Sequence, residues 1–217
     1  MTELDFSEAA VAKLSPAELV SALAELSPDD PAVASLDIDV VARRIDPKKL
    51  SKEQFVDLLS AIGRLADAGA DVDLSTMDPQ NFARIIARAS DDQVEAAAAD
   101  PALRGMVLDE LFRRMTVPFI PDRARDGKVV MAFRVSGGSG EDGFDHYAVQ
   151  IEDRQCTVCT GPSDDAKTTI TLSPTNLLKL ATGNASAKMM FLRRKVKVAG
   201  SLGFAAGFMD MFEVPKA

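Results

Sequence analysis

The sequence of 217 residues offers little material for side-chain catalysis. It contains one histidine, His146, together with two cysteines, one tyrosine and no tryptophan. A single histidine excludes relays and metal centres that combine several histidines. We therefore expect no catalytic residue, no resident metal ion and no cofactor, and we expect that the protein is not an enzyme.

Basic residues are in the minority, with 25 Lys and Arg against 33 Asp and Glu and a net charge of −8. Proteins bind nucleic acids largely by neutralising phosphates, so this charge argues against a nucleic-acid partner. The sequence contains no run of about 18 apolar residues, so it predicts no transmembrane segment. The first residues, "MTELDFSEAA", carry acids where a secretory signal carries bases, and the last, "EVPKA", match no targeting signal. We expect a cytoplasmic protein with reduced thiols.

The first hundred residues have the pattern of an α-helical region. "SPAE" at 15–18 combines an N-capping serine, a proline at the first helical position and a glutamate at the third. Asp46, Asp78 and Asp100 each precede a proline in the same way. The segments "LDIDVVARRI…SKEQF" and "MDPQNFARIIARASDDQV" are weakly similar, at a period near forty residues. Residues 1–103 are therefore predicted to form helix-turn-helix units.

The second half of the chain has the alternation of a β-sheet. β-Branched residues, glycine and a period of two dominate from about residue 116. The segment "SPTNLLKLATG" interrupts the strands with a helix that begins at a capping serine and ends at a glycine. The predicted strands are "KVVMAFRV", "FDHYAVQIED", "QCTVCT", "KTTITL" and "KVKVA".

Both cysteines stand in "RQCTVCTG", as a C-x-x-C pair formed by Cys156 and Cys159. A structural zinc ion needs four ligands, and no second pair is present. Thioredoxin-type pairs begin a helix, whereas Thr157 and Val158 favour a strand. Residues i and i+3 of a strand point to opposite faces, which disfavours a disulfide between them. We predict that Cys156 faces inward with Val158 and that Cys159 faces outward.

Two further patterns have the spacing of a functional motif. "GSGEDG" at 138–143 matches G-x-G-x-x-G, but a strand pattern follows where a nucleotide-binding loop needs a helix, so a hairpin connection is favoured. Ser139 and His146 lack the G-x-S-x-G elbow of a hydrolase, because Glu141 replaces the second glycine. A lone nucleophile, Ser139 or Cys159, is the alternative with least support.

Residues 189–212 have an unusual composition. Arg193, Arg194, Lys195 and Lys197 form a dense basic run in an acidic chain. They fit either the solvated side of a strand or contact with an anionic lipid head group or membrane surface. The same stretch is rich in methionine and phenylalanine, which suits either a core or an adaptable apolar binding surface.

Three short motifs occur in the order strand, helix and strand in the second half: "TITLS" at 169–173, "LATG" at 180–183 and "KVKVAG" at 195–200. With the glycine-rich hairpin before them and "SLGFAAGF" after them, this order resembles the sterol carrier protein type 2 (SCP-2-like) domain. The resemblance covers about residues 104–217, which we expect to form one domain. No comparable resemblance covers residues 1–103.

The resemblance implies an α+β fold, in which a five-stranded mixed sheet carries helices on one face and encloses an apolar tunnel. It also implies non-covalent binding or transfer of lipids such as sterols, fatty acids or acyl-CoA esters. Burial of a lipid chain contributes about 0.8 kcal/mol per methylene, so a dry apolar slot suffices. The residues expected to line the core or cavity are Met131, Phe133, Val149, Ile151, Val158, Leu177, Leu180, Met189, Val196, Val198, Phe204, Phe208 and Phe212.

The chain departs from the family pattern around its short helix. A proline and a glycine are replaced by Ala185-Ser186-Ala187 and Arg193, and Ser201 stands where an acidic residue is common. Met and Phe side chains that fill the tunnel would leave a ligand-poor scaffold. The alternative function is then a protein–protein interaction module formed by the helices of residues 1–103. Metal-binding helical bundles accompany some family members, but residues 1–100 contain no histidine to supply such a site.

Overall fold

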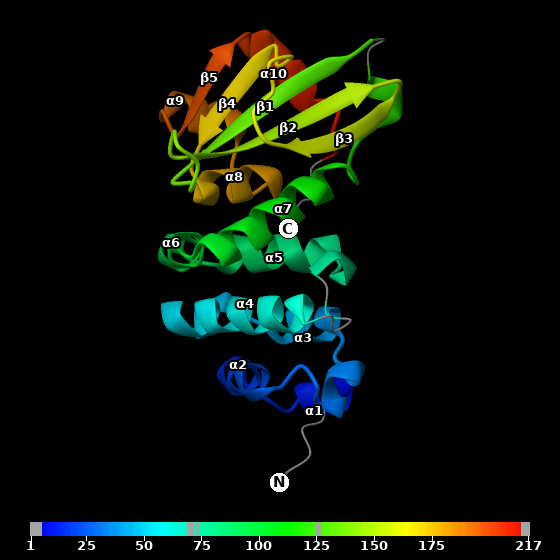
Figure 1. The fold of residues 1–217 in the computed structure, drawn as a ribbon, viewed down its shortest axis with the longest axis vertical. Coiled ribbons are helices and arrows are strands. Elements are labelled where there is room, and N and C mark those ends of the chain that lie inside the picture. The colour runs from blue at the N-terminus through cyan, green and yellow to red at the C-terminus, as the bar shows by residue number, and fades with distance from the viewer. Residues whose placement is uncertain (1–5, 69–71, 73, 125–126, 214–217) are drawn as a thin grey trace. The chain divides into compact units, whose positions relative to one another are not determined.

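The computed structural model describes residues 6–68, 72, 74–124 and 127–213 (Figure 1). The first five and last four residues, on which part of the targeting prediction rests, lie outside the described residues. The chain forms two compact units, Met1–Val107 and Leu108–Ala217. Their boundary falls inside helix α7 (Pro101–Met115). None of the described helices is long and apolar enough to cross a membrane.

Serine capping boxes begin three helices of the N-terminal unit. In each, the serine hydroxyl accepts a hydrogen bond from the backbone N–H three residues later, and the Glu or Gln there accepts one from the serine N–H. These pairs are Ser15 with Glu18, Ser51 with Gln54 and Ser90 with Gln93. The helices are α1 (Glu8–Val11), α2 (Pro16–Glu25), α3 (Ile38–Arg44), α4 (Lys52–Asp67), α5 (Pro79–Arg88) and α6 (Asp91–Ala99), with 3₁₀ helices η1 (Pro31–Ser35), η2 (Pro47–Lys49) and η3 (Leu74–Thr76).

The helices of this unit stack in two columns. Helix α3 contacts both α1 and α5, while α4 contacts both α2 and α6. The repeating element is a helix pair, so the two similar sequence segments correspond to α3 with the start of α4 and to α5 with the start of α6. Each pair buries its apolar face against the next pair, as in repeat proteins. The predicted all-α N-terminal region is confirmed.

Arginine side chains join successive helix pairs. Arg44, Arg64 and Arg84 stand twenty residues apart, and each donates to one or more carbonyls at or shortly after the end of a helix in the preceding pair. Carbonyls near a helix end lack the N–H of the next turn as a donor, and the guanidinium forks of Arg64 and Arg84 each reach more than one of them. The acceptors are Leu14 for Arg44 (2.6 Å), Leu26, Leu23 and Ala24 for Arg64 (2.7, 3.2 and 3.2 Å), and Ile45 (3.0 Å) and Ala42 for Arg84.

The C-terminal unit is built on a five-stranded mixed sheet in the order β3-β2-β1-β4-β5. Strands β1 and β4 are parallel, and every other neighbouring pair is antiparallel. The predicted α+β fold with this sheet is confirmed. The strands are β1 (Val129–Ser136), β2 (Phe144–Glu152), β3 (Gln155–Thr160), β4 (Thr168–Leu172) and β5 (Val196–Gly200), and the helices are η4 (Pro121–Arg123), α8 (Pro174–Ala181), α9 (Ala187–Leu192) and α10 (Leu202–Met209).

The G-x-G-x-x-G segment connects β1 to β2 as a closed hairpin loop. The N–H groups of Gly137 and Gly138 both donate to the carbonyl of Gly143, at 2.9 and 3.0 Å. A Cβ atom at Gly138 would lie 2.3 Å from the backbone nitrogen of Asp145, so this position requires glycine. Because these N–H groups bond within the loop and a strand follows, the loop does not have the geometry of a phosphate cradle.

We predict that Arg64→Ala lowers the free energy of unfolding by about 1–3 kcal/mol, because it removes three hydrogen bonds to carbonyls at the end of α2. Arg43→Ala is the matched control, since its ion pair with Glu8 is exposed and should contribute less than about 1 kcal/mol. Urea unfolding of the full chain, followed by far-UV circular dichroism, measures both. Equal small effects would show that the arginine links contribute little.

Candidate functional site

The central strands of the sheet present one continuous apolar face. Met131, Phe133, Val149 and Ile151 project from β1 and β2 on this face, and at most 1% of each is exposed. The register places Met131 opposite Val149. Ile170 of β4, opposite Phe133, extends the same face. We call this the inner face of the sheet.

Helices of the same unit supply further buried apolar side chains. Leu177 and Leu180 come from α8, which packs against β1. Phe204, Phe208 and Phe212 form a row with ring centroids 6.2 and 5.4 Å apart. Phe208 and Phe212 are buried, and α10 packs against β4. The row therefore belongs to the apolar interior of the unit.

Phe112 of α7 belongs to the same interior and was missed in the sequence analysis. Its ring stacks on Tyr147 at 4.0 Å between centroids and meets Phe133 edge-on at 5.3 Å. The Tyr147 hydroxyl donates to Asp109 of the same helix at 2.7 Å, so its polar end is satisfied. The signal in the sequence was the spacing of Leu108, Leu111 and Phe112, which places three apolar residues on one side of the helix.

The predicted lining residues fall into three classes of exposure. Met189 is exposed, with 45% of its surface in solvent, so its prediction as an interior residue was wrong. Its neighbour Met190 takes the buried position of α9 instead. Val158, Val198 and Phe204 are half-buried. The buried residues are Met131, Phe133, Val149, Ile151, Leu177, Leu180, Val196, Phe208 and Phe212.

The half-buried residues mark the margins of the interior. Val158 lies on β3 and Val198 on β5, which are the two edge strands of the sheet. Phe204 lies in the first turn of α10, directly after β5. Partly exposed apolar side chains therefore lie at both edges of the sheet, and near β5 they come from a strand and from the helix that follows it.

The two cysteines lie on opposite faces of β3. The register pairs Cys156 with Ile151 on the inner face and Cys159 with Ala148 on the other. Cys156 is half-buried and Cys159 is exposed, as predicted. Burial raises the pKa of the Cys156 thiol to about 11. Among the described residues no group of three or more His, Cys, Asp or Glu has the arrangement of a metal site.

His146 makes its polar contact with Asp142 rather than with the candidate nucleophile Ser139. Its Nε2 atom lies 2.9 Å from the Asp142 carboxylate, which Arg134 also contacts at 3.0 Å. Desolvation raises the pKa of Asp142, but hydrogen bonds from His146 and from the Phe144 N–H, together with the charges beside it, lower it overall. The arrangement is an exposed ion-pair cluster near the G-x-G-x-x-G loop.

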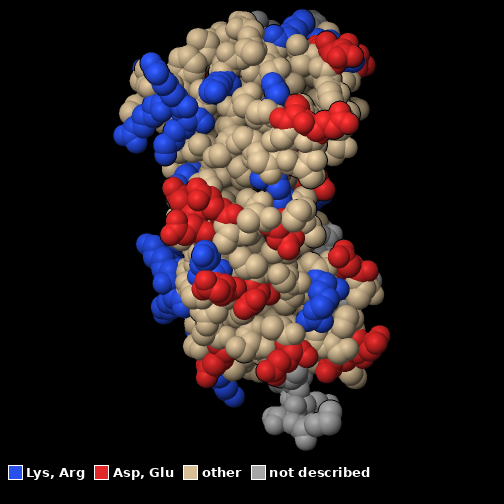
Figure 2. Space-filling view, turned by 60° about the vertical axis from the view of Figure 1, so that its left-hand side comes forward, with Lys and Arg blue, Asp and Glu red and all other residues tan. Residues whose placement is uncertain are grey.

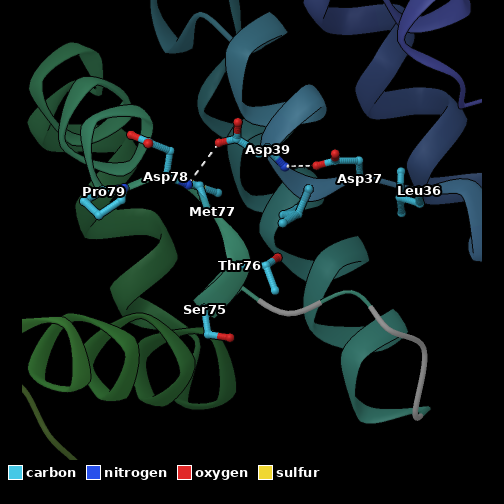
Figure 3. A pocket seen from close by; sticks show the side chains of 9 residues that line it. Leu36, Asp37, Asp39, Ser75, Thr76, Met77, Asp78 and Pro79 are labelled. Carbon is cyan, nitrogen blue, oxygen red and sulfur yellow. Dashed lines mark hydrogen bonds between the residues drawn. The ribbon is translucent and has the colours of Figure 1, made fainter. Parts of the chain in front are cut away.

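The N-terminal unit contains an open pocket of about 690 Å³ beside η3 and the first turns of α3 and α5 (Figure 3). Asp37 and Asp78 use their carboxylates to cap α3 and α5. Asp39 accepts hydrogen bonds from the Asp78 N–H at 3.0 Å and from Asn81 at 2.8 Å. The bond from Asn81 lowers the pKa of Asp39. These carboxylates therefore have structural roles.

A family model described as the SCP-2 sterol transfer family matches residues 109–213. The resemblance stated from the sequence motifs is thereby confirmed for the C-terminal half. No curated protein matches the chain.

Three solved structures are similar to parts or most of this chain. Palmitated SCP2L2 from Aedes aegypti is 14% identical, and the alignment covers 49% of this chain and 95% of that protein with a TM-score of 0.40. Sterol carrier protein 2 from Yarrowia lipolytica in its apo form is 21% identical, over 59% of this chain and 88% of that protein, at 0.31. The inverting sec-alkylsulfatase Pisa1 from Pseudomonas sp. is 13% identical, over 94% of this chain but 33% of the sulfatase, at 0.43. This chain thus spans about a third of the sulfatase.

We predict that an alkylating reagent modifies Cys159 at least about tenfold faster than Cys156 near pH 8. The raised pKa leaves about a hundredth of the thiolate that an ordinary cysteine has there, and the thiolate is the reactive form. The single variants Cys156→Ser and Cys159→Ser isolate each thiol, and mass spectrometry follows their modification. The rate at Cys156 should keep rising as the pH approaches 11. Equal rates would mean that the assigned register of β3 is wrong.

Proposed function

We propose that the SCP-2-like domain formed by residues 109–213 binds or transfers a lipid without covalent chemistry. The ligand is of the sterol, fatty acid or acyl-CoA type and occupies apolar space between the sheet and the helices. The observation that carries the proposal is the buried inner face formed by Met131, Phe133, Val149 and Ile151, within a region that matches a sterol transfer family. Leu177, Leu180, Val196, Phe208 and Phe212 complete the proposed lining.

Burial of the apolar part of the ligand is enough to account for the proposed binding. Each methylene transferred from water contributes about 0.8 kcal/mol. About ten methylenes therefore supply roughly 8 kcal/mol, which corresponds to a dissociation constant near the micromolar range before the costs of association are subtracted. A carrier must also release its ligand, so an affinity of this order suits transfer better than permanent retention.

We propose that the ligand reaches the interior beside β5 and α10. Val198 and Phe204 keep part of their apolar surface in solvent there. Helix α9 precedes β5 and buries one residue, Met190. A Cβ atom at Gly207 of α10 would meet no other atom within 4 Å, so open space adjoins that part of the helix. This margin therefore requires the displacement of fewer packed side chains than the centre of the sheet.

The function needs no chemical step, and we propose that the protein is a carrier rather than an enzyme and acts in the cytoplasm. The likeness to the alkylsulfatase does not alter this proposal, because its TM-score is 0.43 and the chain covers 33% of that enzyme.

A second candidate function belongs to the N-terminal unit, which we propose as a surface for a protein partner. The observation that favours it is the repeated stacking of α1, α3 and α5 beside α2, α4 and α6, since stacked helix pairs form extended binding surfaces. The open pocket beside η3 is the candidate contact. Thr76→Arg should abolish capture of a partner by the full chain, while Phe204→Ser should leave it intact. The reverse result would assign the partner to the C-terminal unit.

We predict that Phe204→Ser weakens binding of a fluorescent fatty acid by at least about tenfold, because the ligand loses an apolar contact. Met189→Ala is the control and should bind normally, since its side chain is exposed. Displacement titrations with palmitate, cholesterol and palmitoyl-CoA identify the ligand class, and native mass spectrometry of protein purified from cells tests for a bound acyl species. The carrier proposal would be contradicted if the purified protein carries no lipid and none of the three ligands changes its unfolding temperature.

A further inference from the structure

One surface of the C-terminal unit combines exposed apolar side chains with basic ones. Met189, Phe191 and Leu192 of α9 have 45%, 41% and 64% of their surface in solvent. Large apolar side chains that stay exposed together mark a binding surface. Lys188 precedes them, and the basic run of 193–197 follows. We call these residues the α9 tip: Lys188, Met189, Phe191, Leu192, Arg193, Arg194, Lys195 and Lys197.

Helix α9 has the reverse of the exposure expected for a surface helix. Met190 is its only buried residue. At 100° per residue, Leu192 and Lys188 lie nearly opposite Met190, with Met189 and Phe191 on the two flanks. The apolar side chains are therefore turned away from the core of the unit. Helix α9 is anchored by Met190, and it presents Met189, Phe191 and Leu192 to solvent.

The charge around the α9 tip differs from that of the chain as a whole. The protein has a net charge of −8, yet residues 166–209 contain no Asp or Glu. Figure 2 shows Lys and Arg side chains gathered at one side of the C-terminal unit, next to uncharged surface. In the part of the chain that the structure describes, none of the five basic residues of the tip forms an ion pair. Their charge is available to an anionic partner.

Arg194 has an unusual backbone conformation in the turn after α9. Its φ is +57°, the left-handed conformation that favours glycine at the end of a helix. The turn is closed by hydrogen bonds from the N–H of Arg194 to Phe191 O (3.0 Å) and from the N–H of Lys195 to Met190 O (2.9 Å). Arginine is disfavoured at this position, where glycine forms the same turn without strain. The basic run is thus held here at some cost in stability.

We propose that the α9 tip docks the protein onto bilayers that contain anionic lipids. The apolar side chains of α9 enter the boundary between head groups and acyl chains, and the flanking bases contact lipid phosphates. This arrangement matches a membrane interface, which is anionic at its surface and apolar beneath. A nucleic acid would satisfy the charges but would leave Leu192 without an apolar environment, whereas a bilayer offers both along one continuous surface. The inference goes beyond ligand binding, because it holds whether or not the interior of the domain takes a lipid.

The test is co-sedimentation of the full chain with vesicles of phosphatidylcholine alone or mixed with phosphatidylserine. We expect binding to the mixed vesicles that weakens as salt is raised, since each basic residue near an anionic surface is worth about a fivefold change in affinity. Arg194→Gly should weaken binding about fivefold while it preserves or raises the temperature of unfolding. Leu192→Ser should also weaken binding, and the loss should differ from the effect of added salt, because the substitution removes an apolar contact and no charge.

Arg154→Gln and Val117→Ala are the matched controls, because they remove an exposed base and an exposed aliphatic side chain outside the tip. Both should bind like the unaltered chain. Equal partitioning to the two kinds of vesicle, or normal binding by both Arg194→Gly and Leu192→Ser, overturns the proposal. Binding of an acidic peptide that depends on Arg194, with no binding to vesicles, would overturn it in favour of a protein partner. Fatty acid binding, measured separately, distinguishes these outcomes from failure of the carrier function.

Discussion

The burial of one apolar face of the sheet is the constraint on which the C-terminal unit depends. β1 lies in the middle of the sheet, paired with β2 on one side and β4 on the other, so its side chains Met131 and Phe133 have neighbours on both sides. The parallel pairing of β1 and β4 requires a long connection, which β2 and β3 provide. The helices of the unit must then cover the inner face of the sheet. α7 does so through Phe112, α8 through Leu177, and α10 through Phe208.

Local rules in the sequence predicted much of this fold. Serine and aspartate caps followed by proline located the starts of α2, α5 and α7, because capping is decided within four residues, whereas Asp46 begins only the 3₁₀ helix η2. Alternation assigned the strands and the opposite faces of Cys156 and Cys159, since the side-chain period of a strand is fixed at two. The family resemblance then supplied the five-stranded mixed sheet, which periodicity alone does not determine, and the order of the strands came from the structure.

Features that depend on contacts between distant segments could not be read in the same way. A helix of six residues is too short for its periodicity to show which methionine faces inward, and this is why Met189 was assigned in place of Met190. The packing of Phe112 against Tyr147 joins residues 35 positions apart, so the apolar spacing within α7 contains a signal for its buried side but none for the partner. The local sequence also gives no signal for the arginines that cap helices of the preceding pair. Their acceptors are backbone carbonyls, which every residue carries.

The order of the strands leaves β5 as one free edge of the sheet. An exposed edge offers unpaired backbone groups to any other extended chain and is a common starting point for aggregation. Lys197 is the second of the five residues of this edge strand and is exposed. If a second copy of the chain paired its own β5 with this edge in register, the two Lys197 side chains would lie together without a counter-charge. The same lysine therefore helps to keep the sheet at five strands and discourages its extension into a continuous one.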